Sequence, residues 1–299
     1  MRTDLDHLPI AKRQELARIV EILFAEFEDA LAGRNAPHRK AGRILKIILF
    51  GSYARGDWVS DPKGGYFSDY DLLVVVNHDE LTDVVEYWAK AEDHLIRELN
   101  VSHRIATPVG FIVHSLADVN KQLRSGRYFF MDIVRDGIAL YEAPNEPFDH
   151  PEKLSPEAAR REAQGYFDEW FPSAQNYLTL AEDARSRGMG KEAAFLLHQA
   201  TERFYHCFLL VLTLYSPKSH KLNFLRSQCE QHDTRLIFGW PRDTRFAQRC
   251  FELLRRAYVD ARYSAHYKIT PEELDWLIKH VESLKDLIGE ICLAKLAEC

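Results

Sequence analysis

Apolar residues in the first half of the chain alternate between helical spacing and short β-branched runs. Such a change of period predicts helices that alternate with strands. The predicted elements are a helix at 9–33, strands at 44–50 and 70–76, a helix at 79–99, a strand at 109–113, and a helix within 115–140 that leads into a last strand at 138–141. The run YDLLVVV is almost continuously apolar, so its strand is expected at the centre of the sheet. The pattern predicts a small α/β sheet.

The second half of the chain contains no convincing strand. Residues 143–155 hold three prolines and few residues that could be buried, which is typical of a linker. Thr270 followed by Pro271 predicts the start of a helix. The helices expected after the linker lie at 156–186, 190–215, 219–231, 244–265 and 271–297.

These elements predict an α+β protein with two domains. The first, 1–145, is a small mixed sheet with helices, and the second, 155–299, is an all-α helical bundle. Hydrophobic residues make up 46% of the chain, which is enough for ordinary buried cores. The length of 299 residues also favours two domains.

Charge and cysteine content exclude several classes of protein. The net charge of -6 gives no global basic field, so any contact with nucleic acid would need a local patch. The five cysteines are widely spaced and form no CxxC pair, which argues against a disulfide framework or a zinc site. The N-terminus has no signal-peptide core, and the longest apolar run, 207–215, is too short to span a bilayer. We therefore expect a cytoplasmic protein with reduced thiols and no membrane role.

Two motifs near strand ends carry candidate chemistry. Asp69 and Asp71 are two residues apart, so both side chains point to one face of a strand. Two carboxylates this close repel each other unless a cation such as Mg²⁺ lies between them. Gly51 and Ser52 follow the preceding strand, where a glycine lets the backbone approach a phosphate. Arg55 lies one turn further on and could reach the same phosphate.

The stretches FGSYARG, residues 50–56, and SDYDLLV, residues 68–74, resemble the signature of the polymerase-β-like nucleotidyltransferase superfamily. The nearest group is the minimal nucleotidyltransferases and their aminoglycoside-adenylyltransferase relatives. The resemblance covers roughly residues 40–142.

This resemblance implies an ATP-type donor, Mg²⁺, and transfer of a nucleoside monophosphate to a hydroxyl. It implies that Gly51 and Ser52 hold the donor phosphates, and that Asp69 and Asp71 hold the metal and are catalytic.

The sequence departs from that family in one respect. The family has a third carboxylate on the next strand, whereas TPVGFIVH, residues 107–114, contains neither Asp nor Glu. Asp118 and Glu142 follow later in the chain. His114 could act as a base, although a lone histidine at a strand end is more often structural. The domain is therefore expected either to use a substitute base or to bind nucleotide without transferring it.

The helical half carries a second candidate site. His198 and Glu202 are four residues apart and share a helix face, as do Arg262 and His266 if their helix continues that far. An arginine beside a histidine could hold a phosphate and transfer a proton, but such pairs are more often structural.

FLLHQATERFYHCFL, residues 195–209, and RYSAHY, residues 262–267, resemble the HEPN family of helical bundles. The resemblance covers roughly residues 157–297. It implies pairing as a homodimer and, in many members, a ribonuclease with four to six residues between its Arg and His. Here only three residues separate Arg262 from His266.

Three hypotheses remain open. The first is an enzyme that transfers AMP or another nucleotide to a small molecule or to a protein hydroxyl, with Tyr263 and Tyr267 as candidate acceptors. The second is an RNA-cutting HEPN domain controlled by its nucleotidyltransferase half, as in toxin–antitoxin pairs. The third is a nucleotide-binding scaffold without catalysis.

Overall fold

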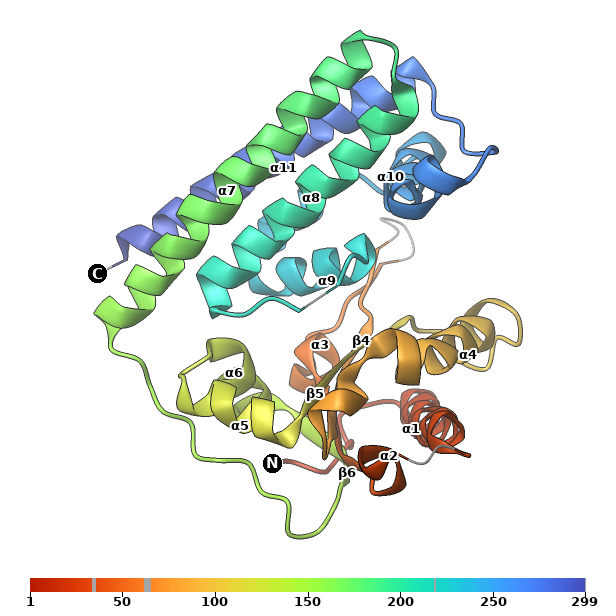
Figure 1. The fold of residues 1–299 in the computed structure, drawn as a ribbon, viewed down its shortest axis with the longest axis vertical. Helices are drawn as coiled ribbons and strands as arrows, with labels where there is room; N and C mark the ends of the chain where they lie inside the picture. The colour runs from red at the N-terminus through yellow and green to blue at the C-terminus, as the bar shows by residue number, and fades with distance from the viewer. Residues whose placement is uncertain (34–35, 62–65, 218, 299) are drawn as a thin grey trace. The chain divides into compact units, whose positions relative to one another are not determined.

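The computed structural model describes residues 1–33, 36–61, 66–217 and 219–298. The chain forms two compact units (Figure 1). The first consists of Met1–Ser60 and Phe67–Lys153, and the second chiefly of Leu154–Cys299. The predicted α+β class is confirmed, because strands pair into the main sheet in the first unit and helices fill the second.

A four-stranded mixed sheet forms the centre of the first unit, with strand order β5-β4-β1-β6. Its strands are β1 (Ile44–Phe50), β4 (Tyr70–Val76), β5 (Val109–Ser115) and β6 (Ile138–Glu142). β4 pairs antiparallel with β1 and parallel with β5, while β6 pairs antiparallel with β1. β1 and β4 are buried along their whole length, so the predicted central position of residues 70–76 is confirmed. A separate short pair is formed by β2 (Ser60–Asp61) and β3 (Tyr66–Phe67).

Helices cover both faces of this sheet (Figure 1). α1 (Ile10–Leu31) and α4 (Ala89–Asn100) lie on one face, with the short α2 (Pro37–Lys40) nearby, while α5 (Leu116–Arg124) and α6 (Tyr128–Asp136) lie on the other. On the first face the ring of Phe27 stacks on Trp88 at 4.8 Å. On the second face Phe129 packs against Phe50 at 5.5 Å. Both faces of β4 are therefore buried, which explains its unbroken apolar run.

Two predicted helices are interrupted in the structure. The region expected as one helix at 79–99 consists of the 3₁₀-helix η1 (Asp79–Thr82), the π-helix η2 (Val84–Trp88) and α4. Asp83 causes the first break, because its extended backbone ends η1 and its side chain accepts a hydrogen bond from the Glu86 N–H at 2.9 Å. Between α5 and α6 the chain turns at Gly126, whose φ of 64° is left-handed.

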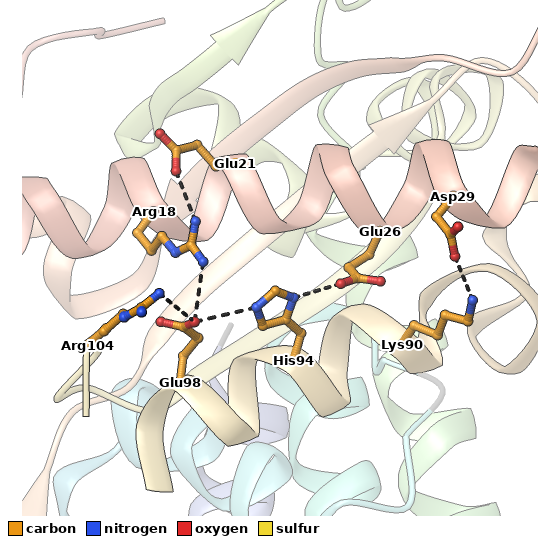
Figure 2. Close-up of polar contacts among 8 residues, drawn as sticks. All are labelled: Arg18, Glu21, Glu26, Asp29, Lys90, His94, Glu98 and Arg104. Carbon is orange, nitrogen blue, oxygen red and sulfur yellow. Dashed lines mark hydrogen bonds and ion pairs between the residues drawn. The ribbon is translucent and has the colours of Figure 1, made fainter. Parts of the chain in front are cut away.

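A polar network joins α1 to α4 (Figure 2). Glu98 is 5% exposed and accepts contacts from Arg18 at 3.3 Å, His94 at 3.4 Å and Arg104 at 3.7 Å. His94 also reaches Glu26 of α1 at 2.7 Å. The network fixes the position of α4 along α1 through charges at the margin of the apolar core.

The second unit is a helical bundle in which α7, α8 and α11 are long helices that run side by side (Figure 1). Its helices are α7 (Pro156–Ser186), α8 (Gly190–Thr213), α9 (Leu222–His232), η3 (Thr234–Gly239), α10 (Arg245–Tyr263) and α11 (Pro271–Ala297). The predicted start of the last helix is confirmed, because Thr270 and Glu273 form a capping box in front of α11. Gly289 allows α7 to approach, since a Cβ there would lie 3.1 Å from the Phe171 ring.

Candidate active site at the β1–α3 turn

The turn after β1 is built around a glycine with a left-handed backbone. Gly51 has a φ of 73°, a conformation that costs other residues about 1–2 kcal/mol. It leads directly into the short helix α3 (Gly51–Arg55), which ends at Gly56 with a φ of 89°. The glycine predicted at this turn therefore has a steric reason to be there.

Ser52, the second residue of the turn, is buried with a free hydroxyl. Its side chain is 5% exposed, and its Oγ atom has no hydrogen-bond partner in the described part of the chain. Buried polar groups are nearly always paired, so an unpaired hydroxyl at this turn suggests a partner that arrives from outside the chain.

The two predicted carboxylates lie where β4 begins, beside this turn. Asp71 is fully buried and sits in the sheet between Phe50 of β1 and Gly110 of β5. Asp69 lies just before β4 and is partly exposed. Because Phe50 pairs with Asp71 and precedes Gly51, the structure brings the Gly51-Ser52 turn and the carboxylates to the same end of the sheet.

Asp69 also lies close enough to Tyr53 of α3 to affect its ionisation. Burial raises the pKa of the Tyr53 hydroxyl, and the negative charges of Glu15 and Asp69 raise it further, although a hydrogen bond with Thr107 opposes them. The Tyr53 ring stacks on Trp58 at 5.3 Å and packs on Tyr70 at 4.5 Å. These contacts anchor α3 to the start of β4.

Small and apolar residues of β5 lie on the same face of the sheet as Asp71. Gly110 pairs with Asp71, and Ile112 is the next residue on that face of β5. His114 is four residues beyond Gly110, or about 13 Å along the strand. Its Nδ1 atom contacts Asp118 at 2.6 Å, and its ring packs edge-on against Phe130. His114 therefore lies away from Asp69 and Asp71. Its contacts with Asp118 and Phe130 support a structural role.

The other carboxylates considered from the sequence also have partners of their own. The hydrogen bond from His114 lowers the pKa of Asp118. Glu142, on β6, pairs with the ammonium group of Lys46, which is buried in the sheet.

Asp132 was not predicted from the sequence. It lies on α6, one turn after the Phe129 ring that packs on Phe50, and burial raises the pKa of its carboxyl group. The positive charge of Arg55 acts on this carboxyl in the opposite direction. Arg55 itself contacts Asp57 at 3.2 Å. No spacing motif in the sequence connects residue 132 with the glycine turn, so only the fold reveals it.

Two carboxylates and a free hydroxyl fit a magnesium ion that is shared with a phosphate-bearing ligand. Mg²⁺ is usually held by one or two carboxylates and completes its shell with water and phosphate oxygens. Across the described ranges, no group of three or more His, Cys, Asp or Glu side chains is arranged to hold a metal ion by itself. The donor set is therefore suited to a metal that arrives with its substrate.

The second predicted pair is not formed as expected. α10 ends at Tyr263, and His266 follows in a turn, so Arg262 and His266 do not share a helical face. Arg262 instead donates from Nε to the Tyr258 carbonyl at 2.6 Å. The helix stops here because Ser264 adopts an extended backbone.

The candidate acceptor tyrosines differ in exposure. Tyr263 is 77% exposed, whereas Tyr267 is buried and its hydroxyl donates to the Leu253 carbonyl at 2.9 Å. The predicted proximity of His198 and Glu202 is confirmed, with Nε2 and Oε2 3.5 Å apart.

A small mixed sheet with a glycine turn beside paired carboxylates defines a nucleotidyltransferase-type domain, here followed by a helical bundle. A family model described as a nucleotidyltransferase domain matches residues 35–117, and one described as a HEPN domain matches residues 167–291. A protein of Methanocaldococcus jannaschii named "Putative protein adenylyltransferase" is 32% identical over 118 residues, which are 39% of this chain and 92% of that protein. The chain belongs to the nucleotidyltransferase domain family and carries a HEPN domain.

The comparisons confirm both resemblances seen in the sequence and support a transferase. None of the helices described is both long enough and apolar enough to cross a membrane.

Proposed function

We propose that this chain transfers AMP from ATP to the hydroxyl group of a protein acceptor, with Mg²⁺ held by Asp69 and Asp71. The observation that carries the proposal is the free, buried Ser52 hydroxyl at the same end of the sheet as the two carboxylates. A phosphate oxygen would give this hydroxyl the partner that the chain does not supply. The name of the M. jannaschii relative supports a protein acceptor.

Each site residue has a defined part in this proposal. Gly51 and Ser52 bind the donor phosphates, and Arg55 balances their charge from the end of α3. When bound, Mg²⁺ neutralises charge on the phosphates during transfer. The acceptor oxygen forms a bond with the α-phosphorus as the bond to pyrophosphate breaks, and the acceptor proton passes to solvent.

Of the two candidate tyrosines in this chain, Tyr263 is the favoured acceptor, because its side chain is exposed. Tyr267 is buried, and its hydroxyl is already hydrogen-bonded. Modification of Tyr263 would add a negative charge beside Arg262, whose guanidinium lies 5.0 Å from the Tyr263 ring. Mass spectrometry after incubation with ATP and Mg²⁺ should place the AMP adduct on Tyr263 in the wild type. The adduct should be lost in Tyr263→Phe and kept in Tyr267→Phe.

Labelled ATP tests the transfer itself. With Mg²⁺, the full-length chain should incorporate label into protein, and Asp69→Asn and Asp71→Asn should abolish that incorporation. Asp93→Asn is the matched control, because Asp93 is an exposed carboxylate on α4. Equal labelling in the wild type and both site variants would exclude the proposed role of these aspartates.

A further inference from the structure

The main sheet of the first unit ends in a strand with an open edge. β5 is the outermost strand, with β4 on one side and no strand on the other within the described ranges. It is seven residues long, pairs with β4 without a register shift, and contains no proline, lysine or carboxylate. At its C-terminal end the Ser115 hydroxyl donates to Asp79 of η1, so the open part lies towards its N-terminal end. Such an edge can pair with another chain.

The opposite edge of the same sheet is protected. β6 is five residues long, ends in the charged residue Glu142, and pairs with β1 through a register shift. The N-terminal segment covers the beginning of this edge, because the Ala139 N–H donates to the Arg2 carbonyl at 2.8 Å. Short length, charge, bulges and covering segments are the usual ways in which proteins prevent unwanted pairing at an edge. Across the residues that the structure describes, β5 has none of these protections at its N-terminal end.

The free backbone groups of β5 belong to alternate residues. The Tyr70 N–H donates to the Pro108 carbonyl at 2.8 Å, so Pro108 and every second residue after it direct their backbone groups towards β4. The N–H and C=O groups of Val109, Phe111 and Val113 therefore point away from β4, and we call them the outward groups. In the described part of the chain the outward groups have no hydrogen-bond partner, and all three residues are partly exposed. They form a row with which an added strand could pair.

The candidate active site lies at the N-terminal end of this edge. Asp71 pairs with Gly110, so the two residues lie side by side on β4 and β5 and share one face of the sheet. A residue of an added strand opposite Gly110 would share that face, at two strand spacings, or about 10 Å, from the Asp71 backbone. Because Gly110 has no side chain, a long side chain could pass over it towards Asp71. Tyrosine carries its hydroxyl at the end of such a side chain, whereas serine and threonine carry theirs on Cβ.

We propose that the outer edge of β5 binds the protein acceptor as an added β-strand and presents a tyrosine of that strand across Gly110 to the donor nucleotide. This inference rests on the proposed transfer reaction and adds the form of acceptor that is recognised, an extended segment with a tyrosine. The tyrosine oxygen forms a bond with the α-phosphorus of ATP as the bond to pyrophosphate breaks, and the phenolic proton passes to solvent. Main-chain hydrogen bonds to the outward groups supply the affinity.

Amide hydrogen exchange of the full-length chain, followed by NMR, tests the edge without a transfer step. The probe is a peptide with the sequence of residues 259–270 that carries Tyr267→Phe, so that Tyr263 is its single tyrosine. A free peptide of this length holds little helix and can extend. Without peptide, the outward amides should exchange rapidly, whereas those of Gly110 and Ile112 should be protected by β4. Saturating peptide should slow the outward amides at least about tenfold.

A proline on the edge separates strand addition from folding. Val109→Pro removes one outward N–H but no bond to β4, since that N–H points away from β4. Val109→Ala is the matched control, because it also shortens the side chain but keeps the N–H. Labelling of the peptide from ATP should be about 5- to 30-fold slower in Val109→Pro than in Val109→Ala, while both bind ATP equally in calorimetry. A peptide with serine in place of its tyrosine should stay unlabelled, because a serine hydroxyl cannot cross Gly110.

Three results would overturn the proposal. The first is protection of the outward amides in the free chain, which would show that the edge is already covered. The second is outward amides that stay unprotected with peptide up to about 1 mM, the range of weak binding. The third is equal peptide labelling in Val109→Pro and Val109→Ala, which would leave the transfer reaction standing without the edge. Peptide that protects the outward amides but is never labelled would support strand addition and count against the proposed transfer, so the two failures are distinct.

Discussion

Replacing Glu98 by Gln tests whether charge, rather than shape, holds α4 against α1. Gln keeps the size of the side chain but removes the carboxylate that faces Arg18, His94 and Arg104 (Figure 2). A hydrogen bond to a charged group contributes about 1.5–3 kcal/mol. Arg18 keeps its second partner, Glu21, at 3.3 Å, so part of that contribution survives. We expect Glu98→Gln to lower the free energy of unfolding of this region by about 1–2 kcal/mol.

Hydrogen exchange of the amides in α4 measures this loss locally, which matters because a chain with two units need not unfold in one step. A loss of 1–2 kcal/mol should speed their exchange roughly 5- to 30-fold. Glu21→Gln is the control, because Glu21 contacts the same Arg18 but is 69% exposed. The exposed pair should contribute no more than about 1 kcal/mol.

The loss of stability in Glu98→Gln should depend on pH, because it comes from the charge of the Glu98 carboxylate. Burial opposes ionisation of Glu98, but the hydrogen bond and charge of Arg18 outweigh it and lower the carboxyl pKa. A lowered pKa means that the stabilisation is present above the unfolded value, about 4.3, and is lost as the pH falls through the folded value. The difference between wild type and Glu98→Gln should therefore shrink below about pH 4. An unchanged difference in acid would refute the electrostatic explanation.

Three further predictions concern the sheet and its glycine turn. Ser52→Ala should abolish AMP transfer. It should leave the melting temperature unchanged or slightly raised, because the deleted hydroxyl has no partner in the described chain. A large fall in melting temperature would contradict this. Gly51→Ala should destabilise the first unit by about 1–2 kcal/mol in urea unfolding, since its φ of 73° disfavours a side chain. Glu142→Gln should destabilise more than Lys46→Met, because only the first change leaves a buried ammonium without its carboxylate; equal losses in urea unfolding would argue against this.

Most of the sheet could be predicted because its strands are short apolar runs that end at glycine or polar residues. β1 and β4 have the predicted bounds, and α7 and α11 begin and end as expected. The division of residues 79–99 was missed because the side chain of Asp83 competes with the helix for a backbone N–H, which apolar spacing does not reveal.

The candidate sites could also be predicted only in part from the sequence. Local motifs correctly grouped the glycine turn with the paired aspartates, since consecutive strands bring them together. The Arg262–His266 pairing was wrong as a helical pair because the sequence does not mark the end of α10 clearly.

The strongest argument for function at the β1–α3 turn is that a buried hydroxyl without a partner in the described chain lies beside a left-handed glycine and a buried carboxylate. Gly51 adopts a left-handed backbone, Ser52 buries a hydroxyl without a partner, and Asp71 is a fully buried carboxylate. Alanine in place of Ser52 would fold at least as well, because the Ser52 hydroxyl has no partner in the described chain. An unsatisfied polar group at one end of a sheet is typical of binding and catalytic sites. Ser52→Ala with unchanged labelling from ATP would remove this argument.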